Sequence, residues 1–139
     1  MVKLLEQLIN LQGISGNESA VRNFIIKEAK KYCKDVSVDK MGNIIARKKG
    51  TIPSVMFLAH MDEIGLMVNS IDQDGKIHIS NIGGIDPIVL IGHRVEIQSK
   101  KGLMNGIITT KEILNDKDAL KKINIDSLFV FTGLNKKGL

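Results

Sequence analysis

The chain has 139 residues, 43% of them hydrophobic, and a formal net charge of +5. This size and composition suit one domain or part of a larger protein, and they exclude wholesale disorder. The lysines form short clusters beside turns and lack accompanying stacking aromatic residues, so we expect no nucleic-acid partner. No signal peptide is evident, and no apolar run approaches the roughly 20 residues of a membrane span, so no membrane partner is expected. With Cys33 as the only cysteine, a reducing, cytoplasmic location is the default.

Two helices are predicted at the start of the chain. Apolar residues between Val2 and Leu11 recur at helical spacing, and Gly13 ends the pattern. Ser15 and Glu18 then have the spacing of a capping box, which would open a second amphipathic helix. The apolar stripe of that helix consists of Val21, Phe24, Ile25, Ala29 and Tyr32.

The hydrophobic period then changes to two, which predicts β-structure. Residues 35–39 and 44–50 flank the turn sequence "KMGN", so we expect a hairpin. The run "SVMFLA", residues 54–59, is continuously apolar and predicts a strand buried on both faces. Helices, a hairpin and a buried strand in this order favour an α/β layered core.

After residue 65 the sequence favours short strands. "LMVNSI" and "KIHIS" flank the turn "DQDG", and "VLIGHRVEIQ", "GLMNGIIT" and "SLFVFTG" are further strand candidates. Between the last two, residues 111–123 look helical or loop-like. This series of short predicted strands indicates a small β-barrel. We therefore expect two domains: residues 1–66, part of an α/β core, and residues 67–139, an incomplete β-barrel.

The polar residues that interrupt the apolar run are the candidate site. His60 and Asp62 are two residues apart, so in extended chain their side chains project to the same side, while Met61 points the other way and packs. A metal-binding histidine commonly donates its second ring N–H to such a carboxylate. The carboxyl end of a buried strand is also where α/β proteins bind ligands. The pattern alone leaves a purely structural His–Asp pair open.

The stretch "LAHMDEIGLMV" resembles the signature of the glutamyl and tetrahedral aminopeptidases, which are dinuclear metallopeptidases with some relatives labelled endoglucanases. "LLEQLINLQGISGNESAVRNFI", "DVSVDKMGNIIARKKG" and "IGGIDPIVLIGHRVEIQSKKGLMNGII" are similar to further parts of that family, in the same order. The resemblance implies a phosphorylase/hydrolase-like α/β core with an inserted β-barrel. His60 would bind one of two divalent ions, zinc or cobalt, and Asp62 would orient it. Peptide substrates and homo-oligomers, from dimers to dodecamers, are also implied.

The resemblance covers an N-terminal portion of the family only, so most metal ligands and the general base have no counterpart here. Glu63 matches the motif without an assigned role. His78 and His93 fall in the β-segment, where a ligand role is not favoured, and three aspartates occupy turns that they would cap: Asp72, Asp74 and Asp86. We expect the fragment alone to be inactive and to bind metal weakly or not at all.

Two other functions stay open. The β-segment could be a non-catalytic oligomerisation or interaction module, because an open sheet edge can pair with another strand. Glycan hydrolysis is less favoured. It needs two carboxylates on opposite sides of a sugar, and the neighbours Asp62 and Glu63 do not provide that arrangement.

Overall fold

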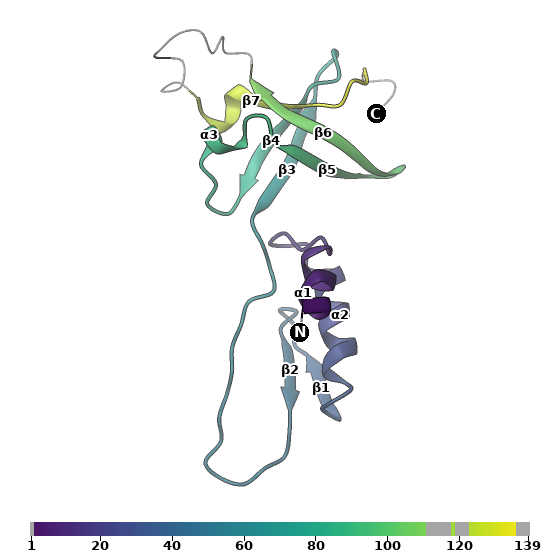
Figure 1. Ribbon diagram of the computed structural model, residues 1–139, viewed down its shortest axis with the longest axis vertical. Coiled ribbons are helices and arrows are strands. Elements are labelled where there is room, and N and C mark those ends of the chain that lie inside the picture. Colours follow the sequence, from purple (N-terminus) through teal and green to yellow (C-terminus); the bar gives the residue numbers. More distant parts are fainter. Residues whose placement is uncertain (1, 111–117, 119–122, 136–139) are drawn as a thin grey trace. The chain divides into compact units, whose positions relative to one another are not determined.

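The computed structural model describes residues 2–110, 118 and 123–135, and the chain divides into two compact units, Met1–Glu63 and Ile64–Leu139 (Figure 1). Each unit is described by itself. Both α-helices and antiparallel β-sheets are present, in keeping with a mixed α/β fold. Among the helices that the structure describes, none combines the length and apolar character needed to cross a membrane.

The first unit begins with two helices. Helix α1 spans Val2–Ile9 and α2 spans Ser19–Ala29. Both were expected from the apolar spacing, but the predicted capping box at the start of α2 is wrong. The N-cap residue is Glu18, and its side chain makes no capping hydrogen bond. Ser15 lies too far upstream to cap and has another partner, described below.

A hairpin follows the helices, as the alternating pattern predicted. Strand β1 (Asp35–Val38) pairs antiparallel with β2 (Ile44–Arg47). Asp39 closes the turn, because its Oδ1 accepts hydrogen bonds from the amides of Met41 and Asn43 at 2.8 and 2.9 Å. The hairpin is tied to α2, since Nε of Arg22 donates to the carbonyl of Gly42 at 2.9 Å.

The predicted buried strand at residues 54–59 is wrong. This segment is extended chain without strand pairing (Figure 1). Its large side chains are exposed, from 74% for Val55 to 93% for Phe57. A strand needs hydrogen-bonding neighbours, and none of the described residues pairs with this segment. The apolar composition of this segment indicates a preference for burial, but its side chains are not buried in the structure.

The second unit is built on one antiparallel sheet. Its strands are β3 (Gly65–Ile71), β4 (Ile77–Ile82), β5 (Arg94–Ser99), β6 (Gly102–Thr110) and β7 (Leu128–Phe131). The spatial order is β3-β4-β7-β6-β5, so the last strand in sequence is inserted between two earlier ones. The core cluster is aliphatic and consists of Ile77, Ile79, Ile108, Leu128 and Val130. Phe129 is also buried.

One connection in this unit differs from the predicted strand pattern, and another lies almost entirely outside the described residues. The start of the strand predicted from "VLIGHRVEIQ" is wrong, because Pro87–Leu90 forms the short helix α3. Asp86 caps it by accepting from the amide of Ile88, and a proline at the first helical position favours the turn. A 3-10 turn, η1 (Ile125–Ser127), precedes β7. The segment expected to be helical or loop-like, residues 111–123, lies almost entirely outside the described residues.

Candidate metal-binding site

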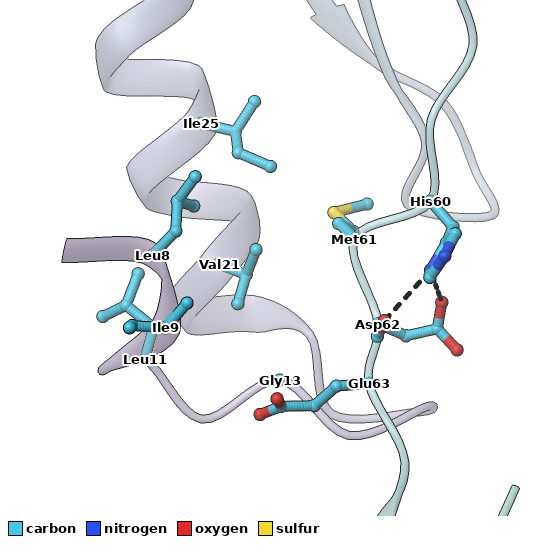
Figure 2. Close-up of a pocket in the computed structure, with 10 residues that line it drawn as sticks. All are labelled: Leu8, Ile9, Leu11, Gly13, Val21, Ile25, His60, Met61, Asp62 and Glu63. Carbon is cyan, nitrogen blue, oxygen red and sulfur yellow. Dashed lines mark hydrogen bonds and ion pairs between the residues drawn. The ribbon is translucent and has the colours of Figure 1, made fainter. Parts of the chain in front are cut away.

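His60 and Asp62 face each other in the structure, as their spacing predicted. Nδ1 of His60 lies 3.0 Å from Oδ1 of Asp62 and 3.0 Å from the Asp62 carbonyl oxygen (Figure 2). Both oxygens act as acceptors, so Nδ1 is the nitrogen that carries the proton in the neutral ring. Nε2 then has a free lone pair, and it makes no hydrogen bond to any described residue. The ring is 85% exposed, so this nitrogen can reach a ligand.

The second oxygen of the Asp62 carboxylate has a partner from far along the chain. The hydroxyl of Ser15, 47 residues upstream, donates to Oδ2. The hydrogen bond from Ser15 and then the one from His60 lower the pKa of Asp62 below its ordinary value. Asp62 is therefore a carboxylate at neutral pH, with each oxygen assigned to a different donor.

The backbone holds these two segments side by side. The amide of Glu63 donates to the carbonyl of Gly13 at 2.8 Å, and Ile14 and Glu63 form a parallel β-bridge. Gly13 is buried, and a Cβ at this position would lie 2.6 Å from Cγ2 of Val21. The loop of residues 13–16 thus approaches helix α2 so closely that a side chain at position 13 would collide with Val21.

A pocket of about 230 Å³ adjoins the His60–Asp62 pair. Its apolar lining comes from α1, α2 and the loop between them and includes Leu8, Val21 and Ile25. Met61 lies on the same side as these helices, while His60 points away from them (Figure 2). The expected opposite orientation of Met61 is therefore confirmed.

The other polar candidates do not join this pair. The side chain of Glu63 points away from His60 and Asp62 (Figure 2). In the second unit, Nε2 of His78 lies 3.5 Å from Oδ2 of Asp72, so this histidine has a carboxylate partner of its own. His93 is exposed, and no side-chain interaction involves it within the described residues.

The turn aspartates divide into two groups. Asp72 and Asp86 cap backbone amides as expected, at Lys76 and Ile88. The expectation for Asp74 is wrong in part, since its side chain pairs with Nζ of Lys76 at 3.1 Å.

The metal-binding capacity of the pair is limited. No group of three or more His, Cys, Asp or Glu side chains suitable for a metal ion occurs in the part of the chain that the structure describes. A single imidazole fits one position of a divalent ion, whereas protein sites normally use three or four ligands. The pair is thus suited to contribute one oriented ligand. Sequence reasoning missed Ser15 in this site, because no local pattern links it to Asp62 and its spacing to Glu18 indicated a helix cap.

The family model "M42 glutamyl aminopeptidase" matches residues 42–138. The chain belongs to the M42 glutamyl aminopeptidase family. The lysyl aminopeptidase of Pyrococcus furiosus is 37% identical, over 97% of this chain and 40% of its own length. The chain therefore spans about two fifths of the first relatives it matches, and the predicted resemblance to this family is confirmed.

Solved structures of M42-type enzymes match the fold. An aminopeptidase from Desulfurococcus kamchatkensis has a TM-score of 0.87 and 29% identity, covering 98% of this chain and 38% of its own. The Pyrococcus horikoshii TET1 peptidase has a TM-score of 0.81 and 34% identity, covering 99% and 42%. A Thermotoga maritima structure named an endoglucanase has a TM-score of 0.75 and 31% identity, covering 94% and 38%. The chain thus matches about two fifths of the mixed α/β fold of these solved structures.

Proposed function

We propose that this chain is the N-terminal part of a metal-dependent aminopeptidase, which removes N-terminal residues from peptides. The observation that carries the proposal is the exposed His60 ring, whose Nδ1 is held by Asp62 while Nε2 stays open. Membership of the M42 family supports the same activity. Because the chain spans about 40% of its relatives, the activity belongs to the whole protein and not to these residues alone.

In this proposal His60 is a ligand to one of two divalent ions, zinc or cobalt. The chemistry that such ions would supply when bound is polarisation of the scissile carbonyl and a lower pKa for a bound water. Asp62 fixes the proton on Nδ1, and its negative charge makes Nε2 a stronger donor of electron density. In this role Asp62 acts through His60, which binds one of its oxygens, while Ser15 binds the other.

We also propose how the chain is divided and assembled. Residues 1–66 would belong to the α/β catalytic domain, and residues 67–139 to an inserted β-barrel that serves in dimerisation. The five-stranded sheet of the second unit supports this assignment. The Pyrococcus horikoshii TET1 peptidase assembles into a tetrahedron or an octahedral shell, which supports a homo-oligomer here as well. We also propose a cytoplasmic location, which the single cysteine supports.

A chimera tests the activity directly. These 139 residues would replace the matching 40% of the Pyrococcus furiosus lysyl aminopeptidase. Release of p-nitroaniline from aminoacyl p-nitroanilides, in the presence of zinc or cobalt, is the expected result. A folded, metal-loaded chimera that is inactive on a panel of aminoacyl groups would contradict the proposal. Release of reducing sugar from cellulose instead would favour the endoglucanase alternative, which the names of two similar structures support.

The chain alone is proposed to be inactive and to bind metal weakly, because one imidazole supplies one ligand. Isothermal titration calorimetry with zinc and cobalt measures this. Tight binding of two ions by the 139-residue chain would be the contrary result.

A non-catalytic interaction module is the second candidate function. Four consecutive apolar side chains, at residues 55–58, are exposed in the first unit, and β3 and β5 are the edge strands of the sheet in the second unit. Such features favour pairing with other polypeptide. A discrete dimer in light scattering, together with no activity in the chimera, would favour this function.

A further inference from the structure

The two oxygens of the Asp62 carboxylate have different partners, and this division suggests a role for Ser15. Oδ1 lies 3.0 Å from Nδ1 of His60, and Oδ2 accepts a hydrogen bond from the Ser15 hydroxyl. The terminal torsion of an aspartate is broad, so an unrestrained carboxylate can rotate about Cβ–Cγ to angles at which neither oxygen points at the ring nitrogen. A donor fixed on Oδ2 restricts that rotation and keeps Oδ1 directed at the ring.

Ser15 is itself held by the backbone, independently of its hydroxyl. The amide of Asn17 donates to the carbonyl of Ile14 at 2.8 Å, which closes a turn around Ser15 and Gly16. Gly16 has φ +88°, the left-handed value that a type II turn needs at its third residue. The upstream side of the turn is fixed by the Gly13–Glu63 hydrogen bond at 2.8 Å.

The downstream side of the turn is anchored by charged side chains. Oε1 of Glu18 accepts from the amide of Gly16 at 2.5 Å, and Oε2 lies 3.3 Å from Nη2 of Arg22. Arg22 in turn binds the carbonyl of Gly42 in the β1–β2 hairpin. The loop is thus restrained on both sides of Ser15, and removing one hydroxyl leaves these restraints intact.

We propose that Ser15 is a positioning residue, which pins the Asp62 carboxylate so that His60 keeps its proton on Nδ1 and presents Nε2 to a divalent metal ion. This inference rests on the proposed function, since it concerns the same imidazole. Ser15 acts through Asp62 and does not itself contact the metal or the substrate. Its hydroxyl is the element that carries the role, and the rest of the side chain is exposed.

The test compares side chains that differ only in the hydroxyl. Ser15→Thr keeps the oxygen, whereas Ser15→Val has the same branched shape without it. Ser15→Ala removes it without adding bulk. Ser19→Ala is a matched control, because Ser19 is also exposed and makes no side-chain hydrogen bond among the described residues. Amide spectra of each variant report whether the first unit keeps its fold.

The readout is the tautomer of His60, measured in the metal-free chain by the ¹⁵N chemical shifts of the imidazole nitrogens. His78 and His93 provide internal references in the same spectra. Wild type, Ser15→Thr and Ser19→Ala are expected to have the Nδ1–H form. In Ser15→Val and Ser15→Ala the share of the Nε2–H form is expected to rise, while the Asp62 carbonyl, 3.0 Å from Nδ1, still favours the Nδ1–H form in part. A merely structural role of Ser15 would leave these shifts unchanged in every folded variant.

Two results would overturn the inference: an unchanged His60 tautomer in folded Ser15→Val, or a Ser15→Thr variant that behaves like Ser15→Val. In the chimera, the loss of the hydroxyl is expected to weaken zinc binding about tenfold, the low end of effects from groups that support a metal ligand. The tautomer readout needs no metal, so its failure leaves the aminopeptidase proposal standing. An inactive chimera with the expected tautomer shifts would instead contradict the proposed function alone.

Discussion

Gly13 lies so close to Val21 that a Cβ on residue 13 would be 2.6 Å from Cγ2 of the valine. Val21 is the buried residue of helix α2, with 7% of its surface exposed. The same glycine accepts the backbone hydrogen bond from Glu63, 50 residues along the chain. Gly13 therefore links helix α2, which it contacts at Val21, to the segment that carries His60 and Asp62, which its carbonyl binds at Glu63.

We expect Gly13→Ala to destabilise the first unit, because the added methyl group would be closer to Val21 than van der Waals contact allows. Overpacking of this kind costs about 1–3 kcal/mol. Urea denaturation followed by circular dichroism measures the loss. Gly50→Ala is the matched control, since a Cβ there meets nothing within 4 Å, and equal stability of the two variants would contradict the prediction.

In the chimera, His60→Ala is expected to abolish metal-dependent hydrolysis, because it removes a ligand. Asp62→Asn keeps the ligand but loses the charge that orients it, and a loss of about 10–100-fold in activity or metal affinity is expected. The controls are His78→Ala and His93→Ala, which should retain activity. Activity that survives His60→Ala at the wild-type level would remove the basis of the metal-site proposal.

The turn of the first hairpin makes a prediction about pH. The side-chain hydrogen bond from Asn43, followed by its backbone amide, lowers the pKa of Asp39 below the ordinary value of 3.8. A depressed folded-state pKa means that Asp39 stabilises the hairpin above the unfolded pKa, and that this contribution is lost as the pH falls through the folded value. Carboxyl ¹³C titration should therefore give a midpoint below 3.8 in wild type.

Replacing Asn43 tests the cause of that shift. In Asn43→Ala the largest cause is gone, so the pKa of Asp39 is expected to move back toward 3.8. The backbone amide remains, which predicts a partial and not a complete return. An identical midpoint in wild type and variant would show that Asn43 does not set the pKa.

The exposed run at residues 55–58 predicts self-association of the isolated chain. Phe57 and Leu58 are 93% and 81% exposed, and contiguous apolar surface of this kind drives association. Phe57→Lys is expected to shift the chain toward monomer in light scattering. Val89→Lys, at a residue 56% exposed in the second unit, is the matched control. Wild-type chain that is monomeric at tens of micromolar would refute this expectation.

Strand β6 offers a neighbouring pair that tests the core of the second unit. Ile108 has no exposed surface and Ile107 is 48% exposed, so the strand alternates between core and solvent. Ile108→Ala is expected to cost about 2–5 kcal/mol through lost burial and the cavity left behind. Ile107→Ala should cost much less. Thermal and urea unfolding of both variants measure these losses of stability. Similar losses in the two variants would argue against this orientation of the strand.

Several features that depend on neighbours in sequence were predicted correctly, although the capping box of α2 and the strand start at residues 89–90 were not. The hairpins of β1–β2 and β3–β4 follow from alternating side chains around short polar turns. The approach of His60 and Asp62 follows from their spacing of two. The family signature around these residues could be recognised for the same reason, because its residues are consecutive in the sequence.

Only the tertiary structure decided the partner of Ser15, the place of β7 between β4 and β6, and the exposure of residues 54–59. Each depends on which distant segment supplies a hydrogen-bond partner or a covering surface, and no local pattern states that. The apolar run encodes a strong preference for burial, but burial needs neighbouring strands that pair with it. The sequence by itself determined the local geometry of the His60–Asp62 pair, and long-range packing decided what surrounds that pair.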